Sequence, residues 1–222
     1  MIINNTYFKG ELYLAHAKPG ITDGVTEVEG AVNEFINDYS REVLFKSLGS
    51  KLFYNFESQL DENNANGLIA GSDSKWDDLL NGKTYTNPDG ELVVWRGIRY
   101  KSRSTGDYDR SFITNYVYFF FQSDNFITTS NAGNQIEMVK NAETVVPANK
   151  TIKAWNKFID LVQGEKDRPE ITLKKYGLAV DYWVGEEEIC LYKFIKDSNK
   201  LVEDTYEGFK AKSWVRISKS LY

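Results

Sequence analysis

The chain has 222 residues, which is long enough for one large domain with a sizeable buried core. Its 41% hydrophobic and 27% charged residues are ordinary for a folded protein, and the net charge of −5 argues against a dedicated nucleic-acid binder. The single cysteine, Cys190, excludes an intrachain disulfide and suits a reducing compartment, and with one histidine it cannot form a Cys/His zinc site.

Residues 1–23 are expected to form an arm that ends near a turn signal, Lys18-Pro19-Gly20. A charged leader followed by an apolar stretch is absent, and no apolar run approaches the roughly 20 residues that cross a membrane. We therefore expect a protein that is made and used without secretion and that has no membrane partner.

A helix, a kink and a second helix are predicted between Thr26 and Leu60. Thr26 and Glu29 have the spacing of a capping box, and apolar residues then recur at helical intervals. Gly49 is the natural stop of the first helix, and Ser50 begins the second.

A short helix starting at Ser74 and ending at Asn81-Gly82 is predicted next, followed by a β-hairpin over residues 83–95. The hairpin turn is Asn87-Pro88-Asp89-Gly90, which has proline and glycine where a type I turn prefers them.

The basic stretch 96–103, with Trp95 and Tyr100 interleaved, permits two interpretations. Its cations can contact phosphate, or they can pair with acids of a neighbouring helix or subunit, as the acidic total favours. The candidate phosphate or acidic-partner contacts are Arg96, Arg99, Lys101 and Arg103.

The most apolar segment, Asp107–Asn125, is predicted to be a helix packed on two sides, with Asp107 at its start. Its apolar side chains extend past half of the helix circumference, and full burial of each contributes roughly 1.5–3 kcal/mol. These side chains are Phe112, Ile113, Tyr116, Val117, Phe119, Phe120 and Phe121.

A second, polar hairpin is predicted over residues 126–140, around Asn131-Ala132-Gly133-Asn134. Its outward residues are too hydrophilic for a core, so we expect it to project from the body. A helix with a clean apolar stripe then begins near Pro147 and ends at Gly164.

Residues 165–222 are treated as a C-terminal extension. It contains a strand-like run at 177–184, a short helix around Glu187–Lys196 and a last strand-like stretch, Phe209–Ile217. Its acidic run 186–188 is expected to complement the dipole at the start of that helix. The basic tail, which carries Trp214 and Tyr222, suits an acidic groove of another chain.

Motifs that carry chemistry are largely absent. Gly82-Lys83-Thr84 ends like a phosphate-binding loop, but Asp77 stands where the first glycine is required. The lone His16 has no nucleophile motif near it, and no GxSxG, HExxH or DxDxDG pattern occurs. We predict no catalytic, cofactor-binding or metal-binding residues, although a pair of glycosidase carboxylates depends on spacing in space and stays open.

These patterns predict an α+β, mainly helical fold: a small helical bundle with projecting β-hairpins. The expected parts are an arm (1–23), a helical domain (24–164) with hairpins at 83–95 and 126–140, and a C-terminal extension (165–222).

The order and texture of these pieces resemble the adaptor, or head–tail connector, proteins of tailed bacteriophages. The pieces are REVLFKSLGSKLFYNF, SKWDDLLNG, YTNPDGELVVWRGI, the aromatic helix, the polar hairpin, VVPANKTIKAWNKFIDLV and LYKFI. The likeness covers about residues 24 to 195 and is nearest to versions from phages of Bacteroidetes hosts, including the first ring protein below the portal in crAss-like phages.

The resemblance implies a non-enzymatic virion protein that assembles in the host cytoplasm as a homo-oligomeric ring, a dodecamer. Its partners would be the portal protein, the next tail ring protein and genomic DNA that passes through without sequence-specific binding. The hairpin would reach a neighbouring ring. The expected interface residues are Phe126, Ile127, Ile136 and Met138 of the hairpin, with Trp214 and Tyr222 of the tail.

Two other functions remain in competition with the connector. Exposed aromatic residues also stack on sugars, so a non-catalytic carbohydrate- or peptide-binding module is the alternative. An enzyme such as a hydrolase ranks last and would need a pocket that holds carboxylates with raised pKa values.

Overall fold

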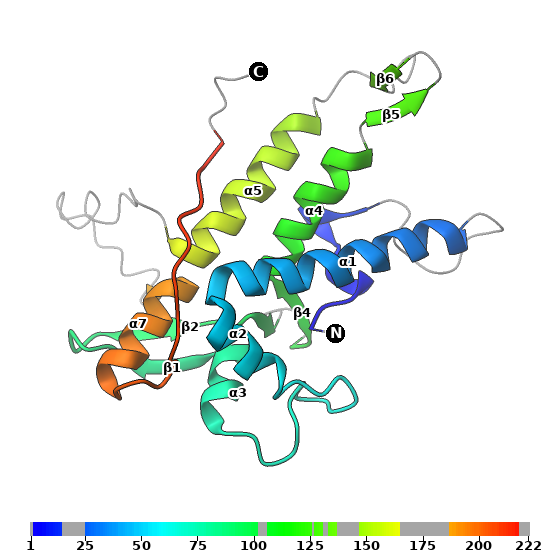
Figure 1. Ribbon diagram of the computed structural model, residues 1–222. Coiled ribbons are helices and arrows are strands. Elements are labelled where there is room, and N and C mark those ends of the chain that lie inside the picture. Colours follow the sequence, from blue (N-terminus) through cyan, green and yellow to red (C-terminus); the bar gives the residue numbers. More distant parts are fainter. Residues whose placement is uncertain are drawn as a thin grey trace, which may run out of the picture.

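The computed structural model describes residues 2–14, 25–101, 106–125, 127–130, 133–136, 147–164 and 187–217 (Figure 1). The predicted α+β, mainly helical fold is confirmed: helices form the body, and small sheets and hairpins lie at its ends. The helices are α1 (Val25–Leu48), α2 (Ser50–Glu57), α3 (Ser74–Asn81), α4 (Phe112–Asn125), α5 (Pro147–Gln163) and α7 (Leu191–Leu201), with short 3₁₀ turns at Asn5–Tyr7 and Gly10–Leu12.

The strands in the described ranges form three small sheets. The sheet with three strands is built from β1 (Lys83–Thr86), β2 (Leu92–Trp95) and β7 (Glu187–Glu188), in the order β1-β2-β7. The other two are hairpin-like pairs, β3 (Arg99–Lys101) with β4 (Tyr108–Ser111) and β5 (Ile127–Ser130) with β6 (Gly133–Ile136).

The predicted kink between the first two helices is confirmed at Gly49. Its φ of +83° lies in the left-handed region, which glycine adopts at little cost, and its N–H donates to the carbonyl of Phe45 at 3.0 Å. The carbonyl of Gly49 then accepts from the N–H of Phe53 at 2.9 Å, so the next helix begins at once.

The aromatic helix α4 lies between α1 and α5, as its two-sided apolar pattern predicts. Tyr39 of α1 stacks on Phe120 with ring centroids 4.7 Å apart, and Trp155 of α5 approaches Phe119 at the same centroid distance. Tyr116, at the centre, is buried against Phe158 at 5.0 Å. Ring contacts of this kind join the three helices into one core.

The predicted start of this helix at Asp107 is wrong, because Tyr108–Ser111 forms strand β4. This strand pairs antiparallel with β3, which places Ser111 opposite Arg99. The Ser111 hydroxyl donates to the carbonyl of Ile98 at 2.6 Å and accepts from the N–H of Ile113 at 3.1 Å. Ser111 therefore binds a first-turn amide of the helix, which was the role expected of Asp107.

The hairpin at residues 83–95 is confirmed, with Thr86 opposite Leu92 and the Gly90 N–H donating to the Asn87 carbonyl at 3.0 Å. The short helix before it is capped by Asp73, one residue before the predicted start at Ser74.

The acidic pair Glu187 and Glu188 was expected at the start of a helix, and this is wrong. Both residues pair in parallel with β2, opposite Val93 and Val94, and the Ile189 N–H continues this pairing by donating to the Val94 carbonyl. The open edge of β2 takes up their backbone groups, so helix α7 begins only at Leu191.

The second hairpin is confirmed: β5 and β6 pair antiparallel, with Ile127 opposite Ile136. It connects α4 to α5 and lies at the far end of these helices from the β1–β2 hairpin (Figure 1). Helix α5 begins at Pro147 and ends before Gly164, whose φ of +90° suits the predicted stop.

The last predicted strand, Phe209–Ile217, is wrong. The segment is extended but pairs with no strand of the described chain; it runs beside α5 and α7 (Figure 1). Its backbone groups are bound mainly by side chains of these two helices, as described below, and the Lys210 N–H donates to the Leu48 carbonyl of α1 at 3.2 Å. The strand-like run predicted at 177–184 lies outside the described residues.

The ends of the described chain pack on the same core as the helices. Tyr7 and Phe8 near the start are buried with Phe194 and Tyr206 near the end, in one cluster with the residues of α1, α4 and α5. The boundaries of the arm, helical domain and extension stay a prediction. Among the helices in the described ranges, none is long and apolar enough to cross a membrane.

Candidate functional site

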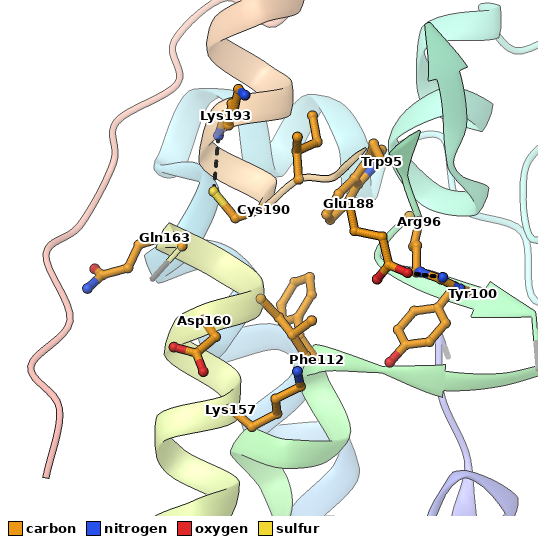
Figure 2. A pocket seen from close by; sticks show the side chains of 14 residues that line it. Trp95, Arg96, Tyr100, Phe112, Lys157, Asp160, Gln163, Glu188, Cys190 and Lys193 are labelled. Atoms are coloured by element: carbon orange, nitrogen blue, oxygen red, sulfur yellow. Dashed lines mark hydrogen bonds and ion pairs between the residues drawn. The ribbon is translucent and has the colours of Figure 1, made fainter. Parts of the chain in front are cut away.

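A pocket of about 330 Å³ lies where the β2–β3 connection, the end of α5 and the start of α7 meet (Figure 2). Trp95 and Phe112 supply apolar walls, and Tyr100 faces the pocket from β3. Charged side chains reach it from several elements: Arg96, Lys157, Asp160, Glu188 and Lys193.

Of the charged side chains that line the pocket, Arg96, Asp160 and Glu188 form ion pairs within the chain. Arg96 forms an ion pair with Glu188, and its guanidinium lies 5.9 Å from the ring centroid of Tyr100. Asp160 forms an ion pair with Arg216 of the C-terminal segment. Burial raises the pKa of Tyr100, although the nearby Arg110 and Arg96 oppose the rise. Its phenol is therefore a neutral hydrogen-bonding group at physiological pH.

The thiol of Cys190 lies in the pocket wall and has a local structural role. Its Sγ accepts from the backbone N–H of Lys193 at 3.4 Å and so caps α7. Burial raises the pKa of this thiol, and the nearby amides and the Lys193 charge only partly oppose the effect. The thiol stays protonated at neutral pH, so it is not an activated nucleophile.

The pocket can therefore bind a small polar molecule through aromatic faces, paired charges and neutral hydrogen-bonding groups. Within the described ranges, no three His, Cys, Asp or Glu side chains gather in a way that holds a metal ion. His16 lies outside these ranges.

The predicted basic contact residues do not act as one open patch. Arg99 donates from Nε to Oδ1 of Asn81 at 2.9 Å and from Nη2 to the carbonyl of Ala65 at 3.2 Å. Both Arg99 and Lys101 lie over the ring of Tyr108, at 4.5 and 5.0 Å from its centroid. Arg103 lies outside the described residues, and phosphate contact by this set stays a prediction.

Of the predicted interface residues, Ile127 and Ile136 are paired across the hairpin, whereas Phe126, Met138 and Tyr222 lie outside the described residues. Trp214 is buried within this single chain, and its role at an interface stays a prediction. It is only 8% exposed because its indole packs on Tyr116, Trp155 and Phe158, so within this chain it is a core residue.

A groove that sequence reasoning missed binds the C-terminal segment. We call residues 209–217 the tail and the side chains of Trp155, Asn156, Gln163 and Tyr192 that bind its backbone the tail groove. Asn156 and Gln163 are seven residues apart, two turns of α5, which places both on one face. That spacing was the available signal, but surface amides are too common for it to indicate a groove.

An aromatic pair is exposed where α1 meets α2. Phe45 and Tyr54 are 40% and 54% exposed, and their rings lie edge to face at 6.0 Å. One turn before Phe45, Arg41 forms an ion pair with Glu57 at 2.7 Å. Large exposed aromatic side chains of this kind are typical of binding surfaces.

The chain was compared with protein-family models, with curated proteins and with solved structures, and none of the three comparisons found a match.

Proposed function

We propose that this chain is a structural virion protein: a subunit of a head–tail connector ring that docks below the portal, extends the DNA channel and supports tail assembly. The observation that carries the proposal is the order of elements, in which two antiparallel core helices, α4 and α5, are joined through the β5–β6 hairpin. This is the arrangement that the family resemblance implies.

The position of the hairpin supports a role in reaching a neighbour. Its strands are short and lie beyond the ends of the two helices that carry it (Figure 1). A two-stranded hairpin is marginally stable by itself, so packing against a partner stabilises it. Its strand edges offer unpaired backbone groups to a neighbouring protein.

The charge distribution supports a channel through which DNA slides. The net charge is −5, and the described arginines of the basic stretch, Arg96 and Arg99, are engaged by Glu188 and Asn81. Each cation that neutralises a phosphate strengthens binding and slows sliding, so a protein that holds its arginines internally releases the duplex readily.

The test is native mass spectrometry of the purified chain with the portal protein of the same phage. We expect a ring complex with the portal and no stable complex with the portal monomer. A variant in which residues 127–136 are replaced by a Gly-Ser linker should still bind the portal but should fail to bind the next tail ring protein. The matched control shortens the polar loop 61–66, which lies on another part of the chain. A chain that remains single in the presence of assembled portal contradicts the proposal.

A carbohydrate- or peptide-binding module is the second candidate, and the exposed pair Phe45 and Tyr54 favours it. Aromatic faces beside a carboxylate such as Glu57 suit the stacking and hydrogen bonding of sugars. Screening the chain against a glycan array tests this candidate. Binding that Tyr54→Ala abolishes, in a chain that ignores the portal, would favour the module over the connector.

A further inference from the structure

The hydrogen bonds that attach the tail are made mainly through its backbone, and the buried indole of Trp214 is its main side-chain anchor. Gln163 donates from Nε2 to the carbonyl of Trp214 at 2.9 Å, and its Oε1 accepts from the N–H of the same residue at 2.9 Å. Asn156 likewise donates from Nδ2 to the carbonyl of Ile217 and accepts at Oδ1 from the N–H of the same residue, both at 3.0 Å. Two side-chain amides therefore imitate two residues of a pairing strand.

Further contacts complete the groove. The Tyr192 hydroxyl donates to the carbonyl of Lys212 at 2.9 Å and accepts from its N–H at 3.0 Å, and the Trp155 indole donates to the carbonyl of Val215 at 2.9 Å. Only one tail side chain between 210 and 216, that of Trp214, is buried; the next residue, Val215, is 76% exposed. The groove thus recognises an extended backbone with one tryptophan anchor.

The α5 part of the groove is supplied by residues distant in sequence from the tail, whereas Tyr192 of α7 lies 20 residues before Lys212. Asn156 and Gln163 are 61 and 51 residues away from the tail residues that they bind. The ion pair between Asp160 and Arg216 likewise joins α5 to the tail. Nothing in these contacts requires that the tail and the groove belong to the same molecule.

The residues before the tail provide a fixed point and a hinge. Tyr206 is buried, and its hydroxyl donates to the carbonyl of Lys75 at 2.7 Å, so the chain is anchored there. Gly208 follows, with a φ of +81°, and glycine accepts other backbone conformations at low cost. Release of the tail at this hinge also breaks the hydrogen bond from the Lys210 N–H to the Leu48 carbonyl, which is 3.2 Å long. The six residues from Gly208 to Trp214 span at most about 20 Å when extended, which sets how near a second groove must lie.

We propose that neighbouring copies of this chain exchange tails, so that residues 209–217 of one copy occupy the tail groove of the next. The exchanged and the closed forms make the same groove contacts and differ at the hinge and at the Lys210–Leu48 hydrogen bond, so the high local concentration within an oligomer keeps the free-energy cost of exchange small. The exchange would link the subunits of an assembly in a head-to-tail series. This inference rests on the part of the proposed function in which copies of the chain assemble.

Cross-linking in a Cys190→Ser background tests the exchange. One chain carries Asp160→Cys and another carries Arg216→Cys; the two are co-refolded, assembled and treated with a short bis-maleimide. If tails are exchanged, a covalent heterodimer forms, because one chain has its only thiol in the groove and the other has its only thiol on the tail. The matched control replaces the tail partner by Lys101→Cys, an exposed residue of β3.

A chain that carries both Asp160→Cys and Arg216→Cys separates the outcomes. Exchange gives a ladder of cross-linked oligomers, whereas a closed tail gives an internally cross-linked monomer. Internal cross-links alone in a protein that native mass spectrometry shows to be oligomeric overturn the exchange and leave the ring standing. Internal cross-links in a chain that stays monomeric even with the portal overturn both. Cross-linking no greater than in the Lys101→Cys control also overturns the exchange.

Discussion

Replacement of Trp214 by alanine should cost this protein a large part of its stability. The indole contacts the rings of Phe158, Trp155 and Tyr116, at centroid distances of 5.0, 5.9 and 5.9 Å. Its Nε1–H donates to the Tyr192 hydroxyl at 3.2 Å. Truncation of a buried tryptophan to alanine typically costs about 3–5 kcal/mol, because the transfer free energy is lost and a cavity remains.

The Trp214→Ala substitution has this full cost in the free energy of unfolding only if the tail unfolds together with the core. If it detaches locally first, the loss is limited to the free energy that holds the tail in its groove. We therefore expect a decrease of about 3 kcal/mol in the free energy of unfolding, measured by urea denaturation followed by far-UV circular dichroism.

The neighbouring residue provides the control for this measurement. Val215 is exposed, so Val215→Ala should change the free energy of unfolding by less than about 0.5 kcal/mol. A loss below about 1 kcal/mol for Trp214→Ala would refute the description of the tail as a cooperative part of the core. Rapid hydrogen exchange at the amides of 212–217 in the unmutated protein would lead to the same conclusion.

Three further outcomes follow from the structure. Gly97→Ala should destabilise the fold by about 2–3 kcal/mol in urea denaturation, because φ is +94° and an added Cβ would lie 2.6 Å from the backbone of Leu80 and Asn81. The control Gly90→Ala has a similar φ but open space around the added Cβ, so it should cost only about 1 kcal/mol. Equal losses of stability in the two variants would contradict the steric argument. Burial, with Glu42 nearby, raises the pKa of Tyr116, so above about pH 10 the folded state keeps a proton that the unfolded state loses. The free energy of unfolding should therefore fall as pH rises above about 10, by at most about 1.4 kcal/mol per pH unit for this group. Tyr116→Phe should make this decline shallower. Cys190 should react with a thiolate-directed disulfide reagent at pH 7 at least about tenfold more slowly in the folded protein than in urea, since burial raises its pKa; equal rates would contradict this.

The sequence predicted those parts of the fold that local rules determine. Gly49 and Gly164 each end a helix with a positive φ, and the Asn87–Gly90 turn fixes the hairpin between β1 and β2. The aromatic stripe of α4 correctly indicated packing on two sides. In these places a few neighbouring residues suffice to determine the backbone.

The errors occurred where distant pairings decide the structure. The start of α4 was placed too early because Asp107 is a good cap, whereas pairing with β3 holds residues 108–111 in a strand. A strand of two residues, Glu187 and Glu188, has no periodicity to detect, and its partner β2 lies almost a hundred residues earlier.

At the tail, too, contacts between residues far apart in sequence determine the structure. An extended backbone was correctly expected over residues 209–217, but a strand was predicted because sheets are the usual partners of extended segments. The actual partners are side chains of Asn156, Gln163 and Tyr192, which were not singled out. The pocket at the α5–α7 junction also depends on which elements meet in space, which local patterns do not encode.

Because carboxamide side chains bind the tail, salt concentration and pH should have little effect on its attachment. Asn156 and Gln163 carry no charge, so dissolved ions do not screen their paired hydrogen bonds and acid or base does not titrate them. The Arg216–Asp160 contact, by contrast, weakens as electrolyte is added. The tail should therefore remain seated from dilute buffer to molar electrolyte, and only the ionic contact near its end should respond.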